Sequence, residues 1–219
     1  MNSDKSIYKG LIYKDLFLLK EAFPIVALAV LFLLFTIIFG FSGGFLALLI
    51  MLLVFAVKVV ESTLIYDETD QWDSFVLTTP MSRKDVVRSK YLLQVIFLVS
   101  TFLICLAVFT AVTNLLPALY GNSWILTMTA IGFCYALVYG AIVIPIYLKF
   151  GAHTSRYISF GLLVLAAGAF GVTLGVGMYL EFEFSASVIP HLIAVIAGSL
   201  AVYGISYGIS QRIYAKKEY

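Results

Sequence analysis

The sequence predicts an all-α integral membrane protein with six transmembrane helices. Of its 219 residues, 62% are apolar and only 12% are charged, and its mean hydropathy is +1.04. Soluble domains are roughly 45–50% apolar. Apolar runs of about 20 residues recur along the chain, and each is long enough to cross a hydrocarbon layer of ~30 Å as a helix. The links between them leave no room for a soluble domain of useful size.

Each predicted span is one of these apolar runs. In order, the spans are residues 23–40, 45–65, 91–113, 125–148, 158–180 and 188–211. The first run lacks a small-residue cleavage site, which argues against a signal peptide. The expected layout is a cytoplasmic interfacial helix (residues 1–22), a six-helix transmembrane domain (residues 23–211) and a cytoplasmic tail (residues 212–219).

Basic residues predict which side the links face. Thirteen of the 14 Lys and Arg residues lie in the first segment, the alternate links at 66–90 and 149–157, and the tail. The other links, 41–44, 114–124 and 181–187, contain none. Because loops rich in Lys and Arg stay in the cytoplasm, both termini are expected to be cytoplasmic.

Residues 7–21 mix apolar and charged positions at roughly helical spacing. This pattern favours a helix that lies in the inner membrane interface with its lysines toward the headgroups. A cytoplasmic extension of the first span is the alternative.

A polar segment at residues 66–90 interrupts the apolar sequence and carries nine of the 26 charged residues. Pro80 breaks a helix continued from the second span. Ser82 followed by Asp85 resembles a capping box, the signature of a helix start. A short cytoplasmic helix from about Arg83 to Lys90 should follow and lead into the third span. It would be a natural docking element for a soluble partner, and an ordinary solvated loop is the alternative.

This segment resembles the corresponding part of ABC-2-type transporter permeases. The resemblance rests on an acidic stretch, Trp72, Phe75, the turn Thr79-Pro80-Met81-Ser82-Arg83, Val86-Val87 and Ser89-Lys90-Tyr91. It is closest to small six-span bacterial permeases similar to exporters of phenol-soluble modulins. Outside this motif, the six-span layout and the N-terminal interfacial helix agree with the family.

The resemblance implies a permease subunit that pairs with a second permease, identical or different, and with two copies of a cytoplasmic ATPase. In that family a coupling helix between spans two and three sits in a cleft of the ATPase. The candidate contact residues are Thr79, Pro80, Ser82, Arg83, Asp85, Val86 and Arg88. A second, smaller contact is expected from the link that holds His153 and Arg156.

The chain itself should not hydrolyse ATP. It lacks the Gly-x-x-x-x-Gly-Lys-Ser/Thr phosphate loop, and its longest polar stretch is too short for a nucleotide-binding domain. ATP and Mg²⁺ are therefore expected on the partner ATPase, and no cofactor or metal on this chain. Beyond these proteins the expected partner is the lipid bilayer, without nucleic acid.

Lys58 and Glu61 are the only strong charges predicted well inside a span. Three residues apart, they share one helix face and can pair, which lowers the cost of placing them there. Either the pair is purely structural or it forms a hinge between the second span and the polar segment.

Glycines and aromatic residues give weaker predictions. The small-xxx-small pairs Gly171/Gly175 and Gly204/Gly208 favour close packing of spans five and six, with a subunit interface or a pliable span as alternatives. Trp72 and Tyr91 fit an aromatic belt at the inner interface.

The preferred function is ATP-driven export of an amphipathic or hydrophobic cargo, such as small peptides, across a bacterial plasma membrane. Two alternatives belong to other classes. One is a non-transporting membrane anchor or immunity protein. The other is an intramembrane serine protease using Ser123 and His191, although Trp124 stands where that family's motif has Gly.

Overall fold

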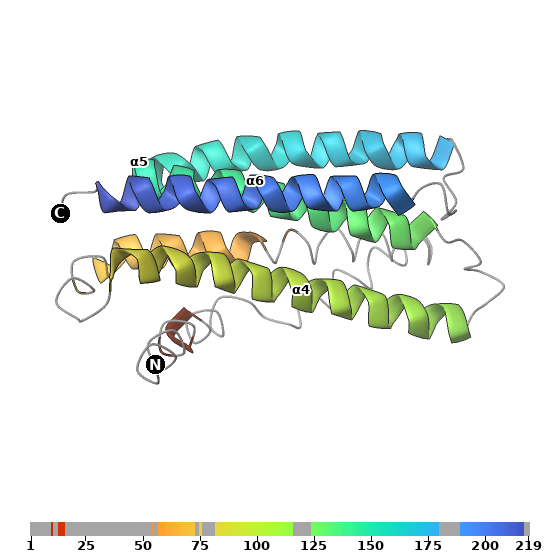
Figure 1. Ribbon diagram of the computed structural model, residues 1–219, viewed down its shortest axis with the longest axis horizontal. Coiled ribbons are helices and arrows are strands. Elements are labelled where there is room, and N and C mark those ends of the chain that lie inside the picture. Colours follow the sequence, from red (N-terminus) through yellow and green to blue (C-terminus); the bar gives the residue numbers. More distant parts are fainter. Residues whose placement is uncertain are drawn as a thin grey trace.

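The computed structural model is helical throughout the part of the chain that it describes. It describes Gly10, residues 13–15, Val54, residues 57–72, Phe75, and residues 82–115, 124–179 and 189–216. Long helices lie side by side along the long axis of the molecule (Figure 1). The described residues contain no strand.

Three long apolar helices are labelled in Figure 1: α4 (Arg83–Leu115), α5 (Trp124–Tyr179) and α6 (Ile189–Ala215). Residues 57–69 form a further helix, which ends in a turn where Gln71 has a φ of 51°. By length and composition, the stretches Arg83–Ala107, Thr129–Thr173 and Pro190–Ala215 could each cross a membrane. Residues 23–40, the first predicted span, lie outside the described residues, as does most of the second.

The helix α5 is an antiparallel pair of arms joined at Gly151. Gly151 has a φ of 74° and a ψ of 173°, values outside the helical region. Side chains on the two sides of this residue meet: the rings of Tyr135 and Phe170 lie 5.5 Å apart, and the Ser155 hydroxyl donates to the Ile146 carbonyl oxygen. The two arms correspond to the predicted spans 125–148 and 158–180. Their link is tighter than predicted, because the helix resumes immediately after Gly151.

A polar seam holds α4 against α6. The Tyr91 hydroxyl lies 2.7 Å from the Ser206 Oγ and 2.8 Å from the Ser210 Oγ. The Tyr203 hydroxyl donates to the Tyr91 carbonyl oxygen at 2.9 Å, and the Tyr91 ring makes edge contacts with Tyr203 and Tyr207. Tyr91 is buried. Its predicted place in an interfacial belt is therefore wrong, because this hydroxyl finds its partners on α6 rather than in water.

The outward faces of the second arm of α5 and of α6 are apolar and unpacked. Leu165, Val172 and Ile205 are each about two-thirds exposed. A Cβ added at Gly161, Gly168, Gly171, Gly175, Gly198, Gly204 or Gly208 would meet no described atom within 4 Å. The predicted close packing of spans five and six through these glycines is thus wrong within the described part of the chain.

Candidate functional site

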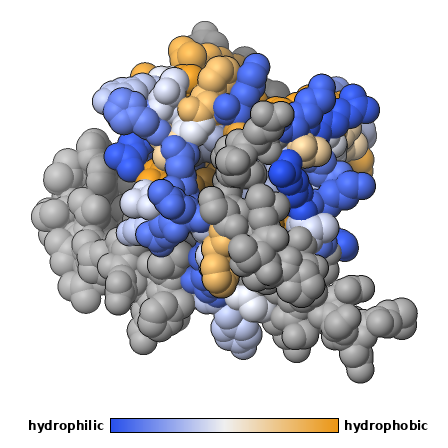
Figure 2. All heavy atoms as spheres, turned by 90° about the vertical axis from the view of Figure 1, so that its left-hand side faces the viewer, coloured by the Kyte–Doolittle hydropathy of each residue, from blue (hydrophilic) through white to orange (hydrophobic). Residues whose placement is uncertain are grey.

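Four parts of the chain meet at one end of the helices, which we call the polar end. The Arg83 guanidinium donates to the Ala215 carbonyl oxygen at 2.9 Å, so the start of α4 lies against the end of α6. Glu68 contacts Ala152, which brings the 57–69 helix to the turn of α5. Figure 2 looks onto this end, and most of the side chains coloured there are hydrophilic.

Exposed basic residues gather at the polar end from three helices. They are Lys84, Arg88, Lys149, Arg156, Arg212 and Lys216. The sequence predicted that the links containing these residues share one side of the membrane, and the structure brings them to one end of the molecule.

The predicted capping box at the start of α4 is confirmed. The backbone N–H of Ser82 donates to the Asp85 carboxylate at 3.1 Å, and the Ser82 hydroxyl donates to the same oxygen at 2.6 Å. The Asp85 N–H in turn lies 3.3 Å from the Ser82 Oγ. These contacts satisfy backbone donors that a helix start leaves unpaired.

The predicted separate short helix is instead the beginning of α4. Residues 83–90 continue without a break into the apolar stretch that follows. Because nothing between Arg83 and Leu115 breaks the backbone hydrogen bonding, a force on the first turns would act along the whole helix.

The predicted contact residues of this region differ in accessibility. Ser82 and Arg88 are exposed, and Arg83 and Asp85 are partly exposed. Val86 is only 4% exposed and belongs to the hydrophobic core. It therefore anchors α4 rather than offering a surface. Thr79 and Pro80 lie outside the described residues.

An ionic cluster of two lysines and two aspartates lies directly beneath the exposed turns of α4. The Lys90 ammonium is 3.0 Å from both carboxylate oxygens of Asp15 and 2.6 Å from Asp67 Oδ2. Lys14 pairs with the other oxygen of Asp67 and lies 3.7 Å from the centre of the Trp72 ring. The side chains of Lys90, Asp15 and Asp67 are 3–7% exposed.

This cluster balances two positive charges against two negative ones. Burial raises the pKa of the Asp15 carboxyl above its ordinary value, and the nearby Lys90 acts in the opposite direction. Lys14 turns toward Asp67 and Trp72, whereas the sequence predicted that lysines of this segment face the headgroups. A buried carboxylate offers it a stronger partner than a hydrated headgroup does.

The link between the arms of α5 is held by a carboxylate from another helix. The backbone N–H of Ala152, at the start of the second arm, donates to Glu68 Oε2 at 2.5 Å. A negative charge suits this position because the first N–H groups of a helix have no partner within it. His153 and Arg156, the predicted second contact, are exposed on the same link, and the His153 ring contacts Tyr157.

The predicted pair of Lys58 and Glu61 is present and has partners that the sequence did not predict. The Lys58 ammonium lies 2.6 Å from Glu61 Oε2. The Tyr139 hydroxyl donates toward Glu61 Oε1 at 2.9 Å and toward the Ser159 carbonyl oxygen at 2.8 Å, so its one proton is shared. The hydroxyls of Tyr147 and Ser159 donate to Glu61 Oε2 at 3.4 and 3.2 Å. Glu61 thus joins the 57–69 helix to both arms of α5.

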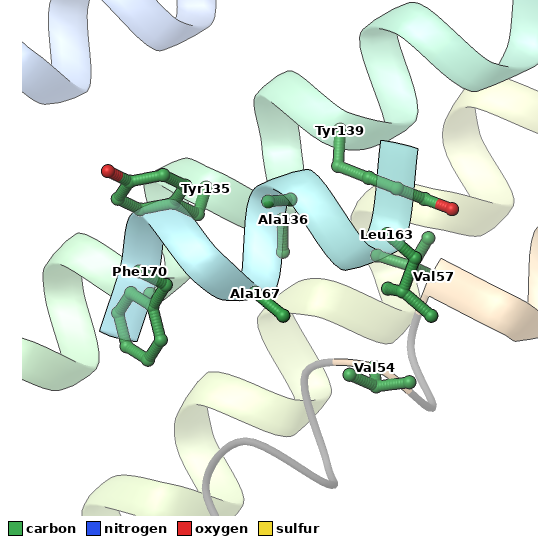
Figure 3. Close-up of a pocket in the computed structure, with 10 residues that line it drawn as sticks. Val54, Val57, Tyr135, Ala136, Tyr139, Leu163, Ala167 and Phe170 are labelled. Atoms are coloured by element: carbon green, nitrogen blue, oxygen red, sulfur yellow. The ribbon is translucent and has the colours of Figure 1, made fainter. Parts of the chain in front are cut away.

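An apolar cavity of about 70 Å³ lies deeper among the helices. Figure 3 shows Tyr139 at one end of it, Tyr135 and Phe170 at the other, and Ala136 and Ala167 between them. Its walls come from Val54, Val57 and both arms of α5. The small side chains leave the space, and the absence of charge from the described lining suits an aliphatic group rather than an ion.

Sequence reasoning missed Asp15, Asp67, Lys90, Glu68 and Tyr139. Each of them has a partner that lies 53 to 84 positions away in the chain. The only local signal was the high density of charge in residues 66–90. The serine of the protease alternative, Ser123, lies outside the described residues. No group of three His, Cys, Asp or Glu side chains suited to a metal ion occurs in the part of the chain searched.

The comparison with known families agrees with apolar helices long enough to cross a membrane. No curated protein matches this chain closely enough to be named as a relative. Residues 10–215 match the family described as ABC-2 family transporter protein. The match covers nearly all of the sequence, so the chain belongs to the ABC-2 transporter family, whose members are membrane-spanning permease subunits of ABC transporters.

Proposed function

We propose that this protein is the permease subunit of an ATP-driven exporter of amphipathic or hydrophobic cargo, with small peptides as the favoured class. It works with a separate ATPase in two copies and with a second permease subunit, identical or different. The ATPase binds ATP and Mg²⁺. The chain crosses a bacterial plasma membrane six times, with the polar end and both termini in the cytoplasm.

The observation that carries this proposal is the continuity of α4 from an exposed polar start into an apolar shaft. Ser82 and Arg88 are accessible at one end, and the same unbroken helix extends to Leu115. A soluble protein that pushes on these turns would therefore move a rod within the membrane. Because α4 contains neither Pro nor Gly, two common causes of a kink, the displacement would be transmitted without an intervening loop.

The cargo class follows from the interior of the helices. Among the described residues the only ion pair deep in the helices, Lys58–Glu61, is satisfied by neighbouring hydroxyls. The described cavity lining carries no charged side chain. This lining favours apolar or amphipathic molecules over ions or sugars.

The test is purification of the tagged chain from its native membrane, followed by measurement of ATP hydrolysis. The wild-type protein should retain an ATPase that contains a phosphate loop, and Arg88→Glu should lose it. Arg212→Glu changes the same charge at the same end, but on α6, and should retain the ATPase. A wild-type preparation without ATPase, or an Arg88→Glu variant that keeps it at wild-type yield, contradicts the proposal.

A further inference from the structure

The ionic cluster joins three segments that are distant in sequence. Lys90 belongs to α4, Asp67 to the 57–69 helix, and Asp15 to the N-terminal segment, 75 positions from Lys90. All three side chains are nearly fully buried. Apolar contacts are non-directional and tolerate small sliding movements. A buried ion pair is favourable only in good geometry, so this cluster selects one register of the three segments.

The cluster is placed where movement of the exposed turns would reach it. Lys90 lies about two turns along α4 from the cap residue Ser82, about 12 Å along the helix axis. Asp67 lies on the same helix as Glu61, whose carboxylate contacts both arms of α5. A displacement of α4 at its start would therefore act first on the Lys90 contacts and then on the helix that leads to Glu61.

One member of the cluster can take over when Lys90 moves away. Lys14 already pairs with Asp67 and is 24% exposed, so it can stay with that carboxylate when Lys90 moves. Asp67 therefore keeps a partner in either position of Lys90, and the contact between Lys90 and Asp15 is the one that opens. An element with two discrete arrangements can act as a switch, whereas a uniformly packed core cannot.

We propose that Asp15, Asp67 and Lys90 form an ionic latch that holds α4 in one register and opens when the ATPase acts on the first turns of the helix. The three residues are positioning residues, since they transmit movement and do not touch the cargo. The opening step rests on the proposed function, whereas the holding role does not.

The holding role can be tested without an ATPase. Spin labels are placed at Gly10→Cys and Leu92→Cys, both exposed positions, after replacement of the two native cysteines, Cys105 and Cys134, by Ala. Protein with the intact cluster should give one narrow distance between the labels. The combined variant Asp15→Leu, Asp67→Leu and Lys90→Met removes all three charges together, so none of these three residues keeps a charge that has lost its partner. It should give a broad distribution of distances between the labels. The control variant Lys149→Met also loses a lysine, but at an exposed site, and its distribution of label distances should stay narrow.

A narrow, unchanged distance in the combined variant overturns the holding role. If the combined variant does not fold, Lys90→Arg replaces it. The guanidinium keeps the charge but cannot occupy the ammonium's position, so the distance should shift or broaden, and an unchanged distance again overturns the holding role.

The opening step is tested on the complex with the ATPase trapped by ATP and vanadate. The intact cluster should give a second, longer distance between the labels, and the combined variant should give the same distribution with and without nucleotide. Hydrolysis of ATP by the wild-type complex with no change in distance overturns the opening step. A chain that binds no ATPase contradicts the proposed function instead, and the label distances without nucleotide still decide the holding role.

Discussion

The polar end and the outward apolar faces of α5 and α6 are held together by different physics. At the polar end, contacts are directional: the Lys90 cluster, the Glu68 carboxylate on Ala152, and the Arg83 guanidinium on Ala215. On the outward faces, large apolar side chains are mostly exposed, and a Cβ added at the glycines would meet no described atom within 4 Å. Charge pairs fix one arrangement of segments, whereas an apolar surface in a bilayer can exchange lipid for another helix at little cost. The arrangement of the segments is therefore fixed at the polar end, whereas the outward faces can pack against either lipid or another helix.

The largest expected loss of stability comes from removing the Lys90 ammonium, which Asp15 and Asp67 share at the polar end. Lys90→Met leaves Asp15 and Asp67 buried with Lys14 as their remaining lysine, and should lower the free energy of unfolding by about 3–5 kcal/mol. Equilibrium unfolding in mixed micelles measures this. Lys149→Met, at an exposed site, should change stability by less than about 0.5 kcal/mol. Equal effects of the two variants would mean that the cluster does not hold this end.

The next effect tests whether Glu61 or Lys58 is the centre of the hydrogen-bond network around their ion pair. Glu61→Leu removes the acceptor of three hydroxyls and the partner of Lys58, and should cost about 2–3 kcal/mol. Lys58→Met should cost about 1 kcal/mol or less, because this side chain is 30% exposed and Glu61 keeps its hydroxyl donors. The same unfolding measurement decides between them. Comparable losses would favour a simple charge pair over a carboxylate hub.

A pair of Gly→Ala substitutions compares a glycine packed against another helix with a glycine on the outward face of α6. At Gly140 a new Cβ would overlap the side chain of Gln94, which is fully buried, so Gly140→Ala should cost about 1–3 kcal/mol. At Gly204 nothing in the described chain lies within 4 Å, and Gly204→Ala should stabilise the isolated subunit by up to about 1 kcal/mol through helix propensity. A destabilised Gly204→Ala subunit would show that this face is packed.

The last of these losses should come from the turn of α5. Gly151 has a positive φ, and a Cβ there would lie 2.9 Å from Glu68 Oε1. Gly151→Ala should therefore cost about 1–2 kcal/mol, since L-residues disfavour this region. Gly151→Asn should cost at least as much as Gly151→Ala, because Asn tolerates a positive φ mainly in the αL region, whereas the ψ of 173° places Gly151 in a region essentially restricted to glycine. Thermal unfolding of the two variants in detergent checks this, and an Asn variant clearly more stable than the Ala variant would exclude strain at this φ and ψ as the cause.

The sequence predicted what depends on local pattern. Apolar runs located the helices in residues 83–115, 124–179 and 189–215, and Ser82 with Asp85 located the start of α4. Lys58 and Glu61 were paired from their spacing alone. In each case the relevant residues lie within a few turns of one another.

Contacts between distant segments were not predictable. Nothing near Asp15 in sequence points to Lys90, and nothing near Glu61 points to Tyr139. Tyr91 shows the same limitation, because an aromatic residue at the start of an apolar run suits a membrane interface as well as a partner such as Ser206. Which of these occurs depends on how the helices pack, and hydropathy alone carries no information on that arrangement.

The hydrogen bond from Arg83 to Ala215 has a practical consequence for reporter fusions. Any domain joined after Tyr219 begins four residues beyond that carbonyl, a reach of at most about 14 Å. A bulky fluorescent tag at this terminus would crowd Ser82 and Arg88 and shield them from other proteins. Localisation studies with such a tag would report where the protein resides but would block the contacts of these residues with other proteins.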